Sequence, residues 1–215
     1  MCRGGFLTAS DANAYRDALA DNRRAVDEAA ELGAATLVLV VGGLPASSRD
    51  LAGARARIAE ALVELAPYAQ AAGVQLSLEP LHPMYCADRA VLSTLPQALG
   101  YAAPYLAGVV GVVVDTFHLW WDPDVLAQIV AAGTRIASFQ VADFMCPLPA
   151  DVLLGRALMG DGVIDFAPMV AAVSAAGYRG DIEVEIFNAD VWASDPDDVL
   201  AEVARRYRKL VAPHA

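Results

Sequence analysis

The chain has 215 residues, of which 57% are hydrophobic, and its formal net charge at pH 7 is −11. The apolar content supports a sizeable folded core and excludes a disordered chain, while the negative charge argues against nucleic acid as a partner. The apolar runs stop well short of the roughly 20 residues that a membrane span requires, and residues 1–5 lack the apolar core of a signal peptide. The three cysteines are far apart and predict neither a zinc site nor a disulfide framework, so we expect a cytoplasmic protein with reduced thiols.

Helical patterns and β-branched apolar runs alternate strictly along the chain. The predicted helices are Asp11 to Leu32, Leu51 to Ala72, a shorter one within Leu92 to Ala102, Pro123 to Ala132, one from Asp165 to near Gly177, and Pro196 to about Leu210. The predicted strands are Thr36 to Val41, Val74 to Leu78, Val109 to Val114, Arg135 to Val141, and Asp181 to Ile186. Ser10, Asp122 and Asp165 are the expected caps, and Gly33 and Gly73 are expected stops.

This alternation predicts an α/β fold with a parallel sheet and right-handed crossovers. No linker or low-complexity segment interrupts it, so we expect a single domain over residues 1–215.

The run from Val109 to Val114 predicts a strand that is buried on both faces, and a carboxylate, Asp115, follows it directly. His118 comes three residues later. In parallel α/β proteins, ligands bind at the carboxyl ends of the strands, where these two residues lie. An aspartate after a strand can equally be a helix cap, although Asp122 is better placed to cap the helix that follows.

Polar residues recur at the carboxyl ends of four strands in succession. They are Glu79, Asp115, Gln140 and Glu185. In a parallel barrel such residues converge on one mouth, and three carboxylates with one amide oxygen suit Mn²⁺ or Mg²⁺. The alternative interpretation is a set of separate caps and surface acids.

Five motifs, taken in order, resemble the xylose isomerase-like (β/α)₈ barrel family of sugar phosphate isomerases and epimerases. The motifs are Glu79–Pro83, Asp115–His118, Gln140–Asp143, Arg156 with Gly160–Gly162, and Glu183–Ile186. By this resemblance Glu79, Asp115 and Glu185 are metal ligands. Gln140 stands where much of the family has a histidine ligand in a His-x-x-Asp pattern, although relatives similar to hydroxypyruvate isomerase also carry a glutamine there.

The resemblance also implies substrate contacts. His118 and Arg156 match substrate-contacting residues, whereas an equally good interpretation of Arg156 is a solvated loop arginine. His82 is a further candidate for substrate binding. Trp120 and Trp121 could belong to the core or to a substrate platform.

The family barrel has eight strands and about 250 residues, and the sequence shows five strands that align with the last five. Residues Cys2–Phe6 look like the exit of the third strand. We therefore expect an incomplete barrel that lacks its N-terminal βα units, because the chain is a fragment, starts from a mis-chosen initiator, or is completed by a partner. The expected exposed edge, Leu37–Val41, favours a homo-oligomer.

The resemblance predicts a divalent-metal-dependent isomerase or epimerase that acts on a small sugar or hydroxy-carbonyl compound. The metal would stabilise an enediolate, and Glu79 and Glu185 would remove and return the proton. His118 could hydrogen-bond a substrate oxygen, and Arg156 could hold a carboxylate or phosphate. The alternatives are a dehydratase of inositol-derived ketones and a degenerate metal- or sugar-binding protein. A DNA-repair endonuclease of the same fold is disfavoured by three histidines and the negative charge.

Overall fold

A computed structural model describes residues 6–215, so the part of the Cys2–Phe6 prediction that concerns residues 2–5 lies outside the described residues. The chain clusters into two compact units. The first extends to Val113 and includes Arg135–Ala137, and the second consists of Val114–Thr134 and Ser138–Ala215. Two strands therefore begin in the first unit and end in the second. The expected single domain stays a prediction.

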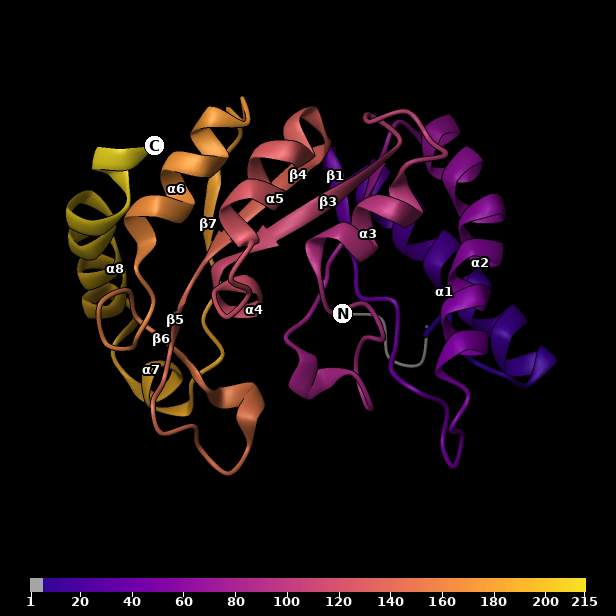
Figure 1. Cartoon of the computed structure of the whole chain (residues 1–215), viewed down its shortest axis with the longest axis horizontal. Coiled ribbons are helices and arrows are strands. Elements are labelled where there is room, and N and C mark those ends of the chain that lie inside the picture. The colour runs from indigo at the N-terminus through magenta and orange to yellow at the C-terminus, as the bar shows by residue number, and fades with distance from the viewer. Residues whose placement is uncertain (1–5) are drawn as a thin grey trace. The chain divides into compact units, whose positions relative to one another are not determined.

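The described residues contain five strands in one parallel sheet and a small antiparallel ladder (Figure 1). The strands are β1 (Thr36–Leu39), β2 (Gln75–Leu78), β3 (Val110–Asp115), β4 (Ile136–Val141), β5 (Asp143–Phe144), β6 (Arg156–Ala157) and β7 (Ile182–Val184). The helices are α1 (Ala12–Glu31), α2 (Leu51–Ala72), α3 (Leu95–Ala102), α4 (Thr116–Leu119), α5 (Val125–Ala132), α6 (Phe166–Ala175), α7 (Ala189–Ala193) and α8 (Pro196–Leu210). The sheet order is β1-β2-β3-β4-β7, and β5 pairs with β6.

The fold expectation is confirmed: parallel strands with intervening helices form an incomplete barrel of the (β/α)₈ type, with five of the eight strands among residues 6–215. The regular order of sheet neighbours follows from the alternation of strands and helices along the chain. Within the described part of the chain, no helix is both long and apolar enough to cross a membrane. The cytoplasmic location stays a prediction.

In the first unit, α1 and α2 pack side by side (Figure 1). Helix α2 has the predicted bounds and ends at Gly73, whose φ of 75° is the left-handed conformation that glycine adopts freely. Helix α1 is capped by Asp11 and not by Ser10, because one oxygen of Asp11 accepts hydrogen bonds from the backbone N–H groups of Asn13 and Ala14.

In the second unit, α5 packs against α6, and α6 is capped by Asp165 as predicted. The prediction that Asp122 is the cap of α5, with Pro123 at the first helical position, is wrong by two residues. The helix begins at Val125, because Asp122 and the residues after it form a turn in which the Val125 N–H donates to the Asp122 carbonyl. The Asp122 carboxylate instead accepts from Gln128.

The long segment between β4 and α6 is more ordered than the loop Ala142–Ile164 that the sequence predicts. It contains the β5–β6 ladder, in which Phe144 pairs with Arg156. This ladder carries Arg156 on a strand, and the arginine is 4% exposed. The interpretation of Arg156 as a solvated loop residue is therefore wrong.

Candidate active site

Asp115 is the last residue of β3 and also the N-cap of α4. Its side chain is 1% exposed. Oδ1 accepts a hydrogen bond from the backbone N–H of Phe117 (2.8 Å), and Oδ2 accepts one from Nη2 of Arg156 (2.7 Å). One oxygen thus caps a helix while the other pairs with a buried cation, so the two interpretations of this aspartate apply to different atoms.

Arg156 joins three of the predicted site residues. Its Nη2 lies 2.7 Å from Oδ2 of Asp115 and 3.1 Å from Oε2 of Glu185, and 3.0 Å from Nε2 of His118. Its Cζ lies 4.7 Å from the centre of the Phe117 ring, close enough for a cation–π contact. Burial strengthens these interactions because little water screens them.

His118 lies on α4, is 4% exposed, and packs edge-on against Phe117. A guanidinium can only donate, so the Nε2 atom of His118 that faces Arg156 must accept. This assigns a neutral imidazole with its proton on Nδ1. Nε2 also lies 3.8 Å from Oδ2 of Asp115. An imidazole that accepts from Arg156 therefore lies beside the Asp115 carboxylate.

Burial has the largest influence on the pKa of both carboxyl groups, and neighbouring groups reverse its direction for Asp115 only. Burial raises the pKa of Asp115, but the Arg156 guanidinium and the hydrogen bonds to the carboxylate more than offset it, so this pKa lies below its ordinary value. Burial raises the pKa of Glu185, Arg156 lowers it, and Asp115 and Glu183 raise it, so this pKa lies above its ordinary value. The pKa values of these two acids are thus shifted in opposite directions, as is typical of acids with different catalytic roles.

Gln140 on β4 is 3% exposed and stands opposite Glu183 of β7 in the parallel register. Its Nε2 donates to Oε2 of Glu183 at 3.1 Å. Its Oε1 is buried and has no hydrogen-bond partner among residues 6–215. Burying a carbonyl oxygen without a partner costs about 1–3 kcal/mol.

This set of donors fits a divalent cation. The amide oxygen of Gln140, which is buried without a partner among residues 6–215, and the carboxylates of Asp115 and Glu185 are ligand types that Mn²⁺, Mg²⁺ or Zn²⁺ accept.

Asp143 has a role that the sequence analysis does not assign. It is 1% exposed and lies two residues after the end of β4, at the start of β5. Its carboxylate accepts hydrogen bonds of 2.8–2.9 Å from the backbone N–H groups of Phe144, Gly160, Gly162 and Ile164. A Cβ atom on Gly162 would lie 2.3 Å from the Phe144 carbonyl oxygen, so only glycine fits. Asp143 therefore organises the Gly160–Gly162 turn.

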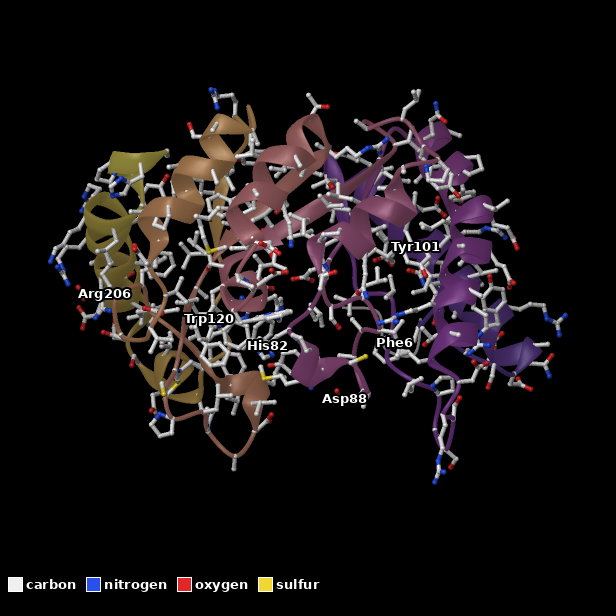
Figure 2. All side chains as sticks on the ribbon, in the orientation of Figure 1. Phe6, His82, Asp88, Tyr101, Trp120 and Arg206 are labelled. Atoms are coloured by element: carbon white, nitrogen blue, oxygen red, sulfur yellow. The ribbon has the colours of Figure 1, made fainter. Side chains whose placement is uncertain are left out.

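Helix α8 holds the same turn from the other side. Nη1 of Arg206, whose side chain is labelled in Figure 2, lies 2.6 Å from Oδ1 of Asp161 and donates to the Met159 carbonyl at 3.0 Å.

Thr116 is a second residue whose role the sequence analysis does not assign. Its side-chain oxygen donates to the Ala142 carbonyl (2.8 Å) and accepts from the Ala142 N–H (3.0 Å). The hydroxyl thus links the start of α4 to the chain just after β4. A threonine beside an aspartate gives no sequence signal of such a link, because its partner is 26 residues away.

The two tryptophans after α4 pack as structural residues. The ring of Trp120, labelled in Figure 2, lies 5.0 Å from that of Phe144, and Nε1 of Trp121 donates to the His118 carbonyl at 2.7 Å. These contacts favour the core interpretation over a substrate platform.

Glu79 and His82 belong to the first unit. Glu79 follows β2, is 5% exposed, and its backbone N–H donates to the Leu39 carbonyl at 3.3 Å. His82 caps a short 3₁₀ turn by accepting from the Met84 N–H, and burial lowers its pKa. The assignment of Glu79 to the metal and of His82 to the substrate stays a prediction.

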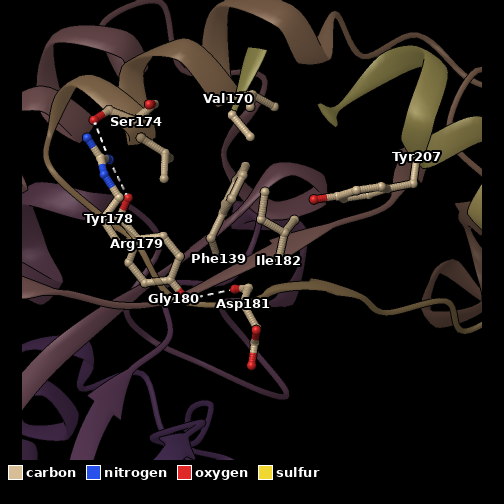
Figure 3. Close-up of a pocket in the computed structure, with 11 residues that line it drawn as sticks. Phe139, Val170, Ser174, Tyr178, Arg179, Gly180, Asp181, Ile182 and Tyr207 are labelled. Atoms are coloured by element: carbon tan, nitrogen blue, oxygen red, sulfur yellow. Dashed lines mark hydrogen bonds between the residues drawn. The ribbon is translucent and has the colours of Figure 1, made fainter. Parts of the chain in front are cut away.

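A separate hollow of about 440 Å³ lies at the amino-terminal end of β7 (Figure 3). It is lined by Phe139 and Ile182 of the sheet and by side chains of α6 and α8. Its polar groups bond to one another: the Tyr178 hydroxyl donates to the Asp181 carbonyl, and Arg179 donates to the Ser174 carbonyl. It is distinct from the Arg156 cluster, which lies at the carboxyl end of β7.

The sequence model of the xylose isomerase-like TIM barrel family matches residues 1–210. The chain belongs to this family. A 3-dehydroshikimate dehydratase of Pseudomonas aeruginosa is 34% identical over 77% of the chain and 25% of its own length. An L-ribulose 3-epimerase of Mesorhizobium japonicum is 28% identical over 73% of the chain and 47% of its own length. The chain thus spans less than half the length of either relative.

Solved structures agree on the fold. The protein SMc04130 of Sinorhizobium meliloti 1021 is 50% identical, with a TM-score of 0.91 over 97% of this chain and 76% of that one. The IOLI protein, whose structure contains a zinc atom, is 19% identical, with a TM-score of 0.81 over 98% of this chain and 74% of that one.

Proposed function

We propose that this chain carries the catalytic site of a divalent-metal-dependent isomerase or epimerase for a small sugar or related hydroxy-carbonyl compound. The observation that supports this most is the cluster around Arg156. It combines an ionised Asp115, a neutral His118 and a Glu185 whose pKa is raised by burial. Such a cluster suits the removal of a proton from a carbon beside a carbonyl group.

The residues that would hold the metal are Glu79, Asp115, Gln140 and Glu185. Of these, the partnerless Oε1 of Gln140 is the strongest support for a cation. When bound, a divalent cation supplies a Lewis acid that polarises a carbonyl oxygen and stabilises negative charge on it. Mn²⁺, Mg²⁺ and Zn²⁺ all remain within the proposal.

Glu185 is the proposed general base. Burial raises its pKa toward the range in which a carboxylate both takes and returns a proton, and Arg156 keeps it oriented. Glu79 is proposed to act on the opposite face. Return of the proton to the neighbouring carbon gives isomerisation, and return to the opposite face of the same carbon gives epimerisation.

Arg156 and His118 are the proposed substrate-binding residues. Both are buried beside Asp115, and the guanidinium has N–H groups that suit a substrate oxygen as charge develops on it. His82 is proposed as a further substrate-binding residue.

A dehydratase is the second candidate, because the relative of 34% identity is named 3-dehydroshikimate dehydratase. It would begin with the same removal of a proton beside a carbonyl group. The two reactions differ after this step, since a dehydratase eliminates a neighbouring hydroxyl as water and an epimerase returns the proton to carbon.

The test is incubation of the protein with Mn²⁺ in D₂O, separately with L-ribulose, D-psicose and 3-dehydroshikimate. The proposal predicts deuterium at the carbon beside the carbonyl of a sugar, with a new epimer or isomer by NMR. Loss of water from 3-dehydroshikimate alone would instead establish the dehydratase. Stoichiometric Mn²⁺ binding without exchange on any compound would contradict both and favour a binding protein.

A further inference from the structure

The Gln140–Glu183 pair restricts how the Gln140 amide can point. A carboxylate accepts hydrogen bonds and an amide NH₂ donates them, so Glu183 selects the orientation in which Nε2 faces it. The other end of the amide, Oε1, is thereby turned away from Glu183. It is this atom that is buried without a partner among the described residues.

Both side chains lie on the face of the sheet away from α6. Phe139 and Ile182, which precede them on β4 and β7, point into the hollow lined by α6 and α8 (Figure 3). Because successive side chains of a strand alternate between faces, Gln140 and Glu183 point to the opposite side. Glu185 follows two residues after Glu183, and its backbone N–H continues the pairing by donating to the Val141 carbonyl.

We infer that Glu183 is a positioning residue, which fixes the Gln140 amide so that Oε1 and not the NH₂ group is presented to a divalent cation. This inference rests on the proposed metal-dependent function. Without the carboxylate, the two amide orientations differ little, and in one of them an N–H group points at the cation and repels it.

Metal-binding side chains in proteins are commonly hydrogen-bonded to carboxylates that do not touch the metal. Removal of such a carboxylate typically lowers metal affinity about 10–100-fold. Here the carboxylate holds the Gln140 amide, and fixing the orientation matters more for an amide than for a histidine imidazole. A rotated imidazole still offers a nitrogen, whereas a rotated amide replaces its only donor atom with hydrogen atoms.

Calorimetric titration with Mn²⁺ and with Zn²⁺ tests the inference on the wild type, Glu183→Gln and Glu183→Ala. Both substitutions are expected to weaken binding at least about 10-fold. The matched control is Asp181→Asn, which removes an acid just before β7. Both acids are exposed but only Glu183 bonds to Gln140, so the control is expected to change affinity less than about threefold, since exposed charges are screened.

A double-mutant cycle separates orientation from charge. In the Gln140→Ala background, Glu183→Ala should weaken binding no more than Asp181→Asn does. Equal losses in both backgrounds would overturn the inference, because Glu183 would then act on the cation by its charge alone.

The amide orientation also has a readout without metal. In ¹⁵N-labelled protein, the Gln140 NH₂ resonances, identified by their loss in Gln140→Ala, should exchange slowly with solvent in the wild type and fast in Glu183→Ala. Equal exchange would overturn the inference even if metal binds. A wild type that binds neither cation would overturn the proposed function and the cation-presenting role together, and the exchange rates would then decide the orientation by themselves.

Discussion

Asp115 and Asp143 are the same residue type, are equally buried at 1% exposure, and each stands at the carboxyl end of a central strand or just after it. Their surroundings differ. One oxygen of Asp115 pairs with the Arg156 guanidinium, while the Asp143 carboxylate is bonded by four backbone N–H groups. A carboxylate surrounded by main chain holds a loop in place, and one surrounded by ionisable side chains is available for chemistry.

Position at a strand end is therefore insufficient evidence for a functional role, because the partners decide it. Substitutions in the cluster around Arg156 should affect activity more than stability, and substitutions in the Asp143 turn should affect stability more than activity. Four substitutions test this contrast.

Glu185→Gln should have the largest effect: it should abolish turnover and weaken Mn²⁺ binding while leaving stability nearly unchanged. It keeps the shape of the side chain but removes the proposed base, whose loss commonly costs ~10²–10⁴-fold in rate. Since the pKa of Glu185 is already raised, a neutral side chain is tolerated, and the free energy of unfolding should change by less than about 1 kcal/mol. The measurements are urea denaturation and turnover of whichever compound shows exchange in the D₂O experiment. Unchanged turnover would exclude Glu185 as the base.

Asp143→Asn should have the largest effect on stability. One carboxylate oxygen becomes an NH₂ group, so two backbone N–H groups lose their acceptor, at about 1–3 kcal/mol each. Urea denaturation measures the loss. The control is Asp165→Asn at the exposed N-cap of α6, where Asn caps about as well as Asp, and it should be nearly neutral. A loss no greater than that of the control would remove the structural role assigned to Asp143.

Asp115→Asn should lie between these two. It removes a hydrogen bond to a charged partner, worth about 1.5–3 kcal/mol, but Glu185 remains beside the guanidinium, so no buried charge is left alone. Mn²⁺ affinity and turnover should both fall.

The stability loss in Asp115→Asn also has a predicted pH dependence. The pKa of Asp115 is lowered in the folded protein, so its contribution is fully present above the unfolded pKa of ~3.9 and fades as pH falls through the lower folded pKa. Denaturation of both proteins at several pH values measures this. A stability difference that grows below pH ~4 would contradict the assignment of Arg156 as its partner.

Gln140→His should have the smallest effect at neutral pH, because imidazole is a somewhat better donor to such metals than an amide. It should add a loss of Mn²⁺ affinity below pH ~6.5, where an unperturbed imidazole takes up a proton. His118→Asn is the needed background, since His118 is a second imidazole beside Asp115. Identical pH profiles for the wild type and Gln140→His would mean that residue 140 is not a ligand.

Features that depend on neighbouring residues could be predicted well from the sequence. The bounds of α2 are predicted to the residue, because the helical pattern and the stop at Gly73 depend only on neighbouring residues, and the structure adds a cap at Asp50. The order of strands follows from the alternation of elements. The caps of α1 and α5 were misplaced by one and two residues, because adjacent polar residues compete for the same N–H groups.

Side-chain roles that depend on partners far away in the sequence could not be predicted from local patterns. Arg156 reaches Asp115 across 41 positions, and Thr116 reaches Ala142 across 26. Nothing in the local sequence of either residue records the bond. The burial of Arg156 depends on a two-residue ladder, too short to leave a periodic pattern.

The two carboxylate oxygens of Asp115 have different partners, and this restricts which side chains position 115 can accept. One oxygen is committed to the backbone of α4 and the other to Arg156, so the side chain has no freedom to drift in length or rotation. Glutamate would move both oxygens by one methylene and asparagine would turn one into a donor. Position 115 is therefore constrained from two sides, by the helix that it caps and by the guanidinium with which it pairs.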